Sequence, residues 1–126
     1  MARKATKNRN DNSLSDLRDR LRRFALDRDW DQYHSPKNLA SALIVEAAEL
    51  LEHFQWMTED ASKSPTTKQL ARVREEMADV LIYLIRLADK LNIDLLLAAR
   101  QKVEKNASKY PADKVRGSSR KYSDFD

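Results

Sequence analysis

Residues 75–91, EEMADVLIYLIRLADKL, indicate the fold most clearly, because apolar side chains occupy almost the whole circumference of the predicted helix. At about 100° per residue, one broad apolar face contains Val80, Leu84, Leu87 and Leu91. Glu76 falls inside this face, and Asp79 lies at its border. The adjoining charged strip contains Glu75, Arg86 and Lys90. Burying an unpaired carboxylate costs roughly several kcal/mol, so Glu76 requires a partner that an apolar face does not supply.

Helices account for most of the sequence. One glycine and three prolines leave little turn chemistry for hairpins, so no strands are expected. Helical periodicity predicts four helices at about 13–28, 36–57, 66–91 and 94–110. Pro36 suits the first position of the second helix, and Pro111 marks the end of the fourth. The predicted N-cap residues are Ser35, Thr66 or Thr67, and Asp94.

The third and fourth predicted helices carry more apolar surface than one small bundle covers. Their further apolar side chains are Leu81, Ile82, Ile85, Leu95, Leu96 and Leu97. A helix that is apolar on all sides must be buried on all sides. We therefore predict an all-α protein, a four-helix bundle that assembles as a homo-oligomer.

Composition indicates one soluble domain. The 126 residues are 41% hydrophobic and 35% charged, which is typical of a soluble helical protein. No apolar run approaches the roughly 20 residues that span a bilayer, and the N-terminus lacks the apolar core of a secretory signal. The absence of cysteine excludes disulfides and thiolate metal sites. We expect a cytoplasmic protein that does not associate with membranes.

Positive charge gathers at the two ends of the chain. The formal net charge is +4, and basic residues crowd positions 1–10 and the stretch DKVRGSSRKY, residues 113–122. Such ends bind nucleic acid or the phosphates of a small ligand, or are simply solvated. The expected organisation is a basic, flexible N-terminus at 1–12, a helical domain at 13–110 and a C-terminal tail at 111–126.

Two helices each carry a pair of carboxylates one turn apart. EAAE contains Glu46 and Glu49, and EMAD contains Glu76 and Asp79. If these helices pack antiparallel, four carboxylates meet and repel one another in a low dielectric. Only cations make that arrangement favourable, and hard oxygen ligands suit magnesium or manganese. Magnesium commonly bridges to substrate phosphates, so the pairs predict a metal site that handles phosphates.

Two other interpretations of the carboxylate pairs remain open at this point. Glu-x-x-Glu is common on helices, where the glutamates form exposed salt bridges. A carboxylate-bridged di-iron site is disfavoured because it needs Glu-x-x-His on two helices. Neither of the two histidines follows a glutamate by three residues.

The sequence resembles the all-α nucleotide pyrophosphohydrolases of the MazG-like family. EAAELLEHFQW (46–56) and EEMADVLIYL (75–84) carry that family's Glu-x-x-Glu and Glu-x-x-Asp signature. The segments that resemble motifs of its dCTP pyrophosphatase branch are RDWDQYHSPKNL (28–39), KVEKNASKYP (102–111) and RGSSRKYSD (116–124). The resemblance covers about residues 24–125.

This resemblance implies the hydrolysis of a deoxynucleoside triphosphate between the α and β phosphates, with dCTP giving dCMP and diphosphate. It implies that magnesium, or alternatively manganese, is held by Glu46, Glu49, Glu76 and Asp79, with Glu46 or Glu49 activating water. A tetramer or dimer of the family's helical-bundle type and a role in cleansing the nucleotide pool are also implied. The alternatives are a relative that prefers dUTP or modified nucleotides, and a non-catalytic bundle that binds nucleic acid through its basic tails.

Further residues are candidates for substrate contacts. Trp30, His34, Trp56 and Tyr83 are candidates for the base pocket, although tryptophans at helix edges are also common core anchors. Tyr83 lies one turn beyond Asp79, where its ring would pack against deoxyribose and disfavour a 2′-hydroxyl. The resemblance implies phosphate or base contacts for Lys102 and Asn106, whose helical face Lys109 shares. It implies a C-terminal clamp over the substrate formed by Arg116, Arg120, Lys121 and Tyr122.

Overall fold

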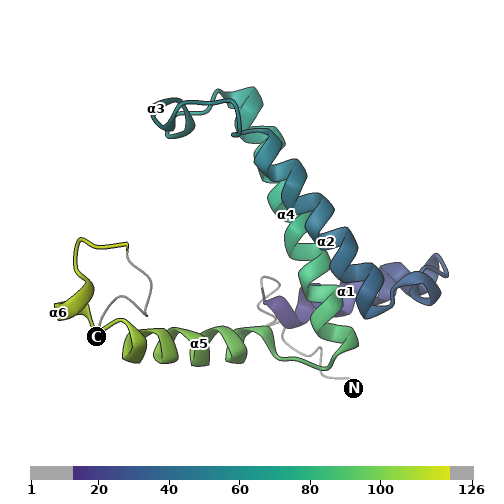
Figure 1. Ribbon diagram of the computed structural model, residues 1–126. Helices are drawn as coiled ribbons and strands as arrows, with labels where there is room; N and C mark the ends of the chain where they lie inside the picture. The colour runs from purple at the N-terminus through teal and green to yellow at the C-terminus, as the bar shows by residue number, and fades with distance from the viewer. Residues whose placement is uncertain (1–12, 120–126) are drawn as a thin grey trace, which may run out of the picture. The chain divides into compact units, whose positions relative to one another are not determined.

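The computed structural model describes residues 13–119, and this part of the chain contains helices and no strand. The prediction of an all-α protein is confirmed for these residues. Figure 1 labels the elements in chain order, which are α1 (Leu14–Asp27), η1 (Asp31–Tyr33), α2 (Pro36–Glu52), α3 (Glu59–Ser62), α4 (Thr67–Lys90), α5 (Leu95–Lys109) and α6 (Ala112–Val115).

The helices begin where the sequence predicted. Ser35 accepts a hydrogen bond from the backbone of Asn38 at 3.2 Å, and Pro36 occupies the first turn of α2. Thr66 caps α4 through a reciprocal pair of hydrogen bonds with Gln69, at 2.8 and 3.2 Å. Asp94 accepts from the backbone of Leu97 at 3.0 Å and caps α5. The predicted N-caps are therefore confirmed, with Thr66 chosen over Thr67.

Helices α2 and α4 form an antiparallel pair, and α1 packs against α4 (Figure 1). The apolar core of the described residues is small and comprises Ala25, Leu39, Val73, Ile85 and Ala88. These side chains come from all three helices, so the core fixes α2 beside α4 and holds α1 against the pair. This packing sets the relative positions of the two carboxylate-bearing helices.

The chain divides into two compact units, and the boundary between them in the sequence falls between Asn92 and Ile93. Asn92 has a φ of 55°, a left-handed conformation that commonly ends helices and that asparagine tolerates. Three long helices, α1, α2 and α4, belong to the described part of the first unit, whereas α5 and α6 belong to the second. The four-helix bundle and its homo-oligomeric assembly therefore stay predictions.

Some boundaries differ from those predicted. Helix α2 ends at Glu52 rather than near Met57, because the following residues form tight turns such as Phe54 N–H to Leu51 O at 2.9 Å. The four-residue helices α3 and α6 lie in segments that were expected to be irregular. A helix of about one turn is too short to show a 3.6-residue period. Between residues 13 and 119, no helix has the length and apolar content that crossing a bilayer requires.

Candidate active site

Carboxylates of α2 and α4 converge between the two helices. We call Glu46, Glu49 and Glu76 the acidic cluster. Each contributes one carboxylate oxygen, and the three oxygens all lie within 4.8 Å of one another. The antiparallel packing of α2 and α4 thus brings together three of the four residues that the resemblance implied as metal ligands. Asp79 lies one turn further along α4, close enough for its charge to act on Glu46.

Burial and crowding make this acidic cluster unfavourable without a cation. Among residues 13–119, the buried atoms Glu46 Oε2 and Glu76 Oε2 have no hydrogen-bond partner. Burial raises the pKa of Glu46 to about 7, and the neighbouring carboxylates of Glu49, Asp79 and Glu76 add to the increase. Leaving such oxygens unpaired is costly. An all-oxygen donor set of this kind fits a hard divalent cation such as magnesium or manganese.

His53 lies beside the acidic cluster, although the sequence assigned it no role. Its Nε2 atom is 3.6 Å from Glu76 Oε1, and both side chains are largely buried. The signal that could have revealed this contact is its spacing, because His53 follows Glu46 by two helical turns and shares its face. The imidazole therefore flanks the cluster from the C-terminal end of α2.

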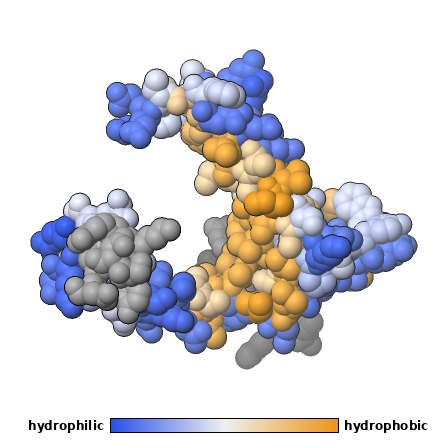
Figure 2. Space-filling view, viewed as in Figure 1, coloured by the Kyte–Doolittle hydropathy of each residue, from blue (hydrophilic) through white to orange (hydrophobic). Residues whose placement is uncertain are grey.

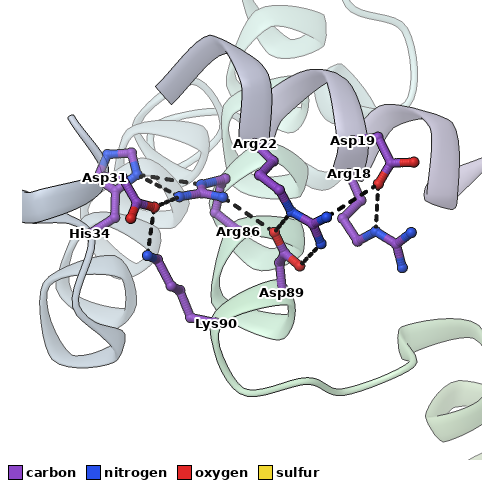
Figure 3. A network of polar contacts seen from close by, with 8 residues as sticks. All are labelled: Arg18, Asp19, Arg22, Asp31, His34, Arg86, Asp89 and Lys90. Atoms are coloured by element: carbon purple, nitrogen blue, oxygen red, sulfur yellow. Dashed lines mark hydrogen bonds and ion pairs between the residues drawn. The ribbon is translucent and has the colours of Figure 1, made fainter. Parts of the chain in front are cut away.

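A second polar cluster lies about three turns further along α4 and is centred on Arg86 (Figure 3). Although the sequence placed Arg86 on a charged strip of its helix, its side chain is only 3% exposed. Arg86 donates hydrogen bonds to Asp31 at 3.0 Å and to Asp89 at 3.3 Å, and its Nη2 lies 3.3 Å from His34 Nδ1. Arg22 on α1 forms a bidentate ion pair with Asp89, at 2.6 and 3.0 Å. We call these five residues the Arg86 network.

Electrostatics within the Arg86 network favour charged aspartates and a neutral histidine. Hydrogen bonds from Lys90 and Arg86 lower the pKa of Asp31. Burial, followed by the positive charge of Arg86, lowers the pKa of His34. A neutral His34 has one ring nitrogen free to accept a hydrogen bond, and Nδ1 faces the guanidinium.

The four aromatic candidates for the base pocket lie in different environments. Trp56 follows α2 and is 89% exposed. Trp30 is 47% exposed and makes an edge-to-face contact with Phe24, with ring centroids 5.7 Å apart. Neither tryptophan is therefore a core residue of this chain. Tyr83 is half-buried on α4, and His34 belongs to the Arg86 network.

The remaining candidates lie in the second unit or beyond the described residues. Lys102 and Asn106 are exposed on α5, and Lys109 at its end is half-buried. Arg116 follows α6 and is exposed. These residues belong to the second unit, whereas the acidic cluster belongs to the first, so their contacts with the substrate stay a prediction. The basic segment 1–12 and the clamp residues Arg120, Lys121 and Tyr122 lie outside residues 13–119.

The fold and the acidic cluster define an all-helical protein with a candidate divalent-cation site between two antiparallel helices. Residues 42–125 match the model of the MazG-like family, and the chain belongs to that family. It is 44% identical over 116 residues to dCTP pyrophosphatase 1 of Homo sapiens and, over the same length, to that of Rattus norvegicus. Each alignment covers 90% of this chain and 68% of the relative.

A solved structure agrees with this assignment. The crystal structure of a pyrophosphatase from Archaeoglobus fulgidus is similar, with a TM-score of 0.74 and 45% sequence identity. The similarity covers 78% of this chain and 92% of the archaeal chain. The family predicted from the sequence motifs, including its dCTP pyrophosphatase branch, is confirmed by these matches.

Proposed function

We propose that this protein hydrolyses dCTP to dCMP and diphosphate with the aid of a divalent cation, and that it cleanses the nucleotide pool. The observation that carries the proposal is the convergence of Glu46, Glu49 and Glu76, with buried carboxylate oxygens that lack a protein partner within residues 13–119. Support for the substrate comes from relatives that are named dCTP pyrophosphatase 1 and are 44% identical.

The acidic cluster and Asp79 have a defined task in this reaction. Glu46, Glu49, Glu76 and Asp79 would hold magnesium, with manganese as the alternative. A bound cation of this kind neutralises phosphate charge and lowers the pKa of a coordinated water. Glu46 or Glu49 would accept a proton from the water as its oxygen bonds to a phosphorus of the α–β linkage, and the bridging P–O bond would break to give dCMP and diphosphate.

Recognition of the nucleotide falls to residues outside the acidic cluster. The exposed rings of Trp30 and Trp56 would stack on the base, a contact worth roughly 1–3 kcal/mol per base. Tyr83, one turn beyond Asp79, would pack against deoxyribose and exclude a 2′-hydroxyl. His34 would complete the base pocket. Lys102 and Asn106 would contact the phosphates or the base, and Lys109 shares their helical face. The proposed clamp over the substrate comprises Arg116, Arg120, Lys121 and Tyr122.

Release of diphosphate from a panel of nucleotides tests the proposed function. We expect dCTP to have the highest kcat/KM among the common nucleoside triphosphates when magnesium is present, and turnover to cease when magnesium is chelated. The panel includes CTP, dATP, dUTP and base-modified deoxynucleotides. Comparable kcat/KM values for dCTP, dATP and dUTP would contradict the assignment to dCTP, whereas a strong preference for dUTP or a modified base would identify a different substrate.

Apolar surface on α2 and α4 supports assembly into a homo-oligomer. Figure 2 shows an apolar band over these helices. Their exposed apolar side chains include Ile44 on α2 and Met77 on α4, which are 67% and 57% exposed. The buried core of the described residues is much smaller than this band. Exposed apolar areas of this extent mark association surfaces. We propose that a second copy of the chain covers the band in a dimer or tetramer.

Light scattering at micromolar protein concentration tests this assembly. The expected particle mass is at least twice the chain mass of 14.6 kDa. A charge placed among the exposed apolar side chains of α4, as in Met77→Lys, is expected to reduce that mass because a buried unpaired lysine disfavours association. A monomeric mass for the unmodified protein is the result that would exclude the proposed assembly.

A further inference from the structure

We propose that Arg86 is a positioning residue for substrate recognition. Its side chain holds residues 29–34 in place, and the ring of Trp30 is thereby held in position to stack on the base. The inference deepens the proposed function and rests on it for the role of Trp30. It concerns a residue that lies about three turns from the acidic cluster along α4 and takes no part in holding a cation.

The burial of Arg86 calls for an explanation beyond packing. Arg86 is 3% exposed, which makes it the most deeply buried charged residue within residues 13–119, and removing a guanidinium from water is expensive unless it is paired. Its partners are divided between two parts of the chain: Asp89 lies on its own helix, whereas Asp31 and His34 lie at the two ends of η1. Arg86 thus ties η1 to α4 at both ends (Figure 3).

Backbone hydrogen bonds to the end of α1 also hold Asp29 and Trp30, the two residues that precede η1. Asp29 has a φ of 54°, a left-handed conformation that is uncommon for a residue other than glycine. The backbone N–H of Trp30 donates to Ala25 O at 2.9 Å, and that of Asp29 donates to Leu26 O at 3.1 Å, which closes α1. Gln32 donates to the Asp29 carboxylate at 2.8 Å. Strain of this kind persists only where surrounding contacts determine the conformation.

The position of Trp30 follows from these contacts. Its backbone is bonded to the end of α1, and the next residue, Asp31, is bonded to both Arg86 and Lys90. The indole ring itself remains 47% exposed, with an edge-to-face contact to Phe24. An exposed ring on a firmly held backbone loses little conformational entropy when a base stacks on it. Arg86 therefore helps to keep the exposed ring of Trp30 in a fixed position, where a ligand can stack on it.

A variant at Arg22 provides a matched control for variants at Arg86. Arg22 pairs with Asp89 from the α1 side, as Arg86 does from within α4, but none of its hydrogen bonds in the described residues reaches η1. Replacing Arg22 therefore removes an ion pair from the same network without releasing the turn. Replacing Asp31 with asparagine removes the negative charge that pairs with Arg86 and Lys90 and so weakens the hold on the start of η1, but it leaves Arg86 paired with Asp89.

The test compares Arg86→Met, Asp31→Asn and Arg22→Met in the full chain. We expect Arg86→Met and Asp31→Asn to raise KM for dCTP about tenfold, the scale of losing one stacked base, with little change in kcat. Arg22→Met is expected to keep both constants. In a Trp56→Phe background, where Trp30 is the remaining tryptophan, acrylamide quenching should increase for Arg86→Met and not for Arg22→Met.

Each result has a defined meaning. If Arg86→Met and Asp31→Asn are folded and keep the KM of the parent, the positioning role is wrong. It is also wrong if Arg22→Met raises KM equally, because the effect is then one of general stability. If Arg86→Met does not fold, Asp31→Asn decides. If the parent hydrolyses no nucleotide, the proposed function fails, and the quenching comparison alone then decides whether Arg86 holds Trp30.

Discussion

Replacing Glu49 with glutamine is expected to slow turnover of dCTP by about a thousandfold and to leave the helices folded. The factor corresponds to the several kcal/mol of transition-state stabilisation that a bound cation supplies, at roughly 1.4 kcal/mol per tenfold change in rate. Glutamine keeps the size of the side chain but loses the negative charge that a cation requires. Steady-state diphosphate release and circular dichroism measure the two parts of this prediction.

The same helix offers a matched control for Glu49→Gln. Glu52 lies one turn further along α2, is exposed and is not a member of the acidic cluster. Glu52→Gln should therefore retain the activity of the parent. Glu49→Gln should be at least as stable as the parent without metal, since it relieves repulsion with Glu46. Near-normal activity of Glu49→Gln, or its unfolding, would contradict the proposed role of the cluster.

The second large effect is expected from pH in the absence of divalent cations. The pKa of Glu46 is raised from an ordinary value of 4.5 to about 7 in the folded protein, so folding favours its protonated form. The contribution of Glu46 to stability is therefore fully present below about pH 4.5 and is lost as the pH rises to about 7. A divalent cation should reverse this trend, because it binds the ionised carboxylate.

Urea denaturation at several pH values, with chelator or with magnesium, measures this dependence. Comparison with Glu46→Gln isolates the contribution of this group, because Asp31, Asp89 and His34 also titrate with shifted pKa values. Those three have lowered pKa values and therefore add stability as the pH rises. If the parent and Glu46→Gln show the same pH dependence with chelator present, Glu46 is not the buried, crowded carboxyl group described above.

Much of the fold was predictable from the sequence because its signals are local. The caps Ser35, Thr66 and Asp94 act within one helical turn, and each begins the helix that was predicted. Helices α1, α4 and α5 have boundaries within a few residues of those expected. The short helices α3 and α6 were missed because a single turn has no period to detect. Assembly was inferred from excess apolar surface, which indicates that a partner is required but not how it docks.

The acidic cluster was predictable for a similar reason, whereas the Arg86 network was not. The spacing within each carboxylate pair places two acids on one helical face, and Glu76 was conspicuous on an apolar face. Arg86 pairs with Asp31, which lies 55 residues away in the sequence. A helical wheel assigns a residue to a face but does not identify what packs against that face. The burial of Arg86 therefore depends on tertiary contacts that periodicity does not contain.

Calorimetric titration of the metal-free protein with magnesium or manganese at pH 7 tests the central claim most directly, because it requires no substrate. The acidic cluster predicts saturable binding accompanied by proton release, since the pKa of Glu46 is about 7 and the cation displaces its proton. Proton release is measured by repeating the titration in buffers of different ionisation enthalpy. We expect binding to be lost in Glu49→Gln and retained in Glu52→Gln. Absence of binding by the parent, or equal binding by Glu49→Gln, would contradict a cation site formed by Glu46, Glu49 and Glu76.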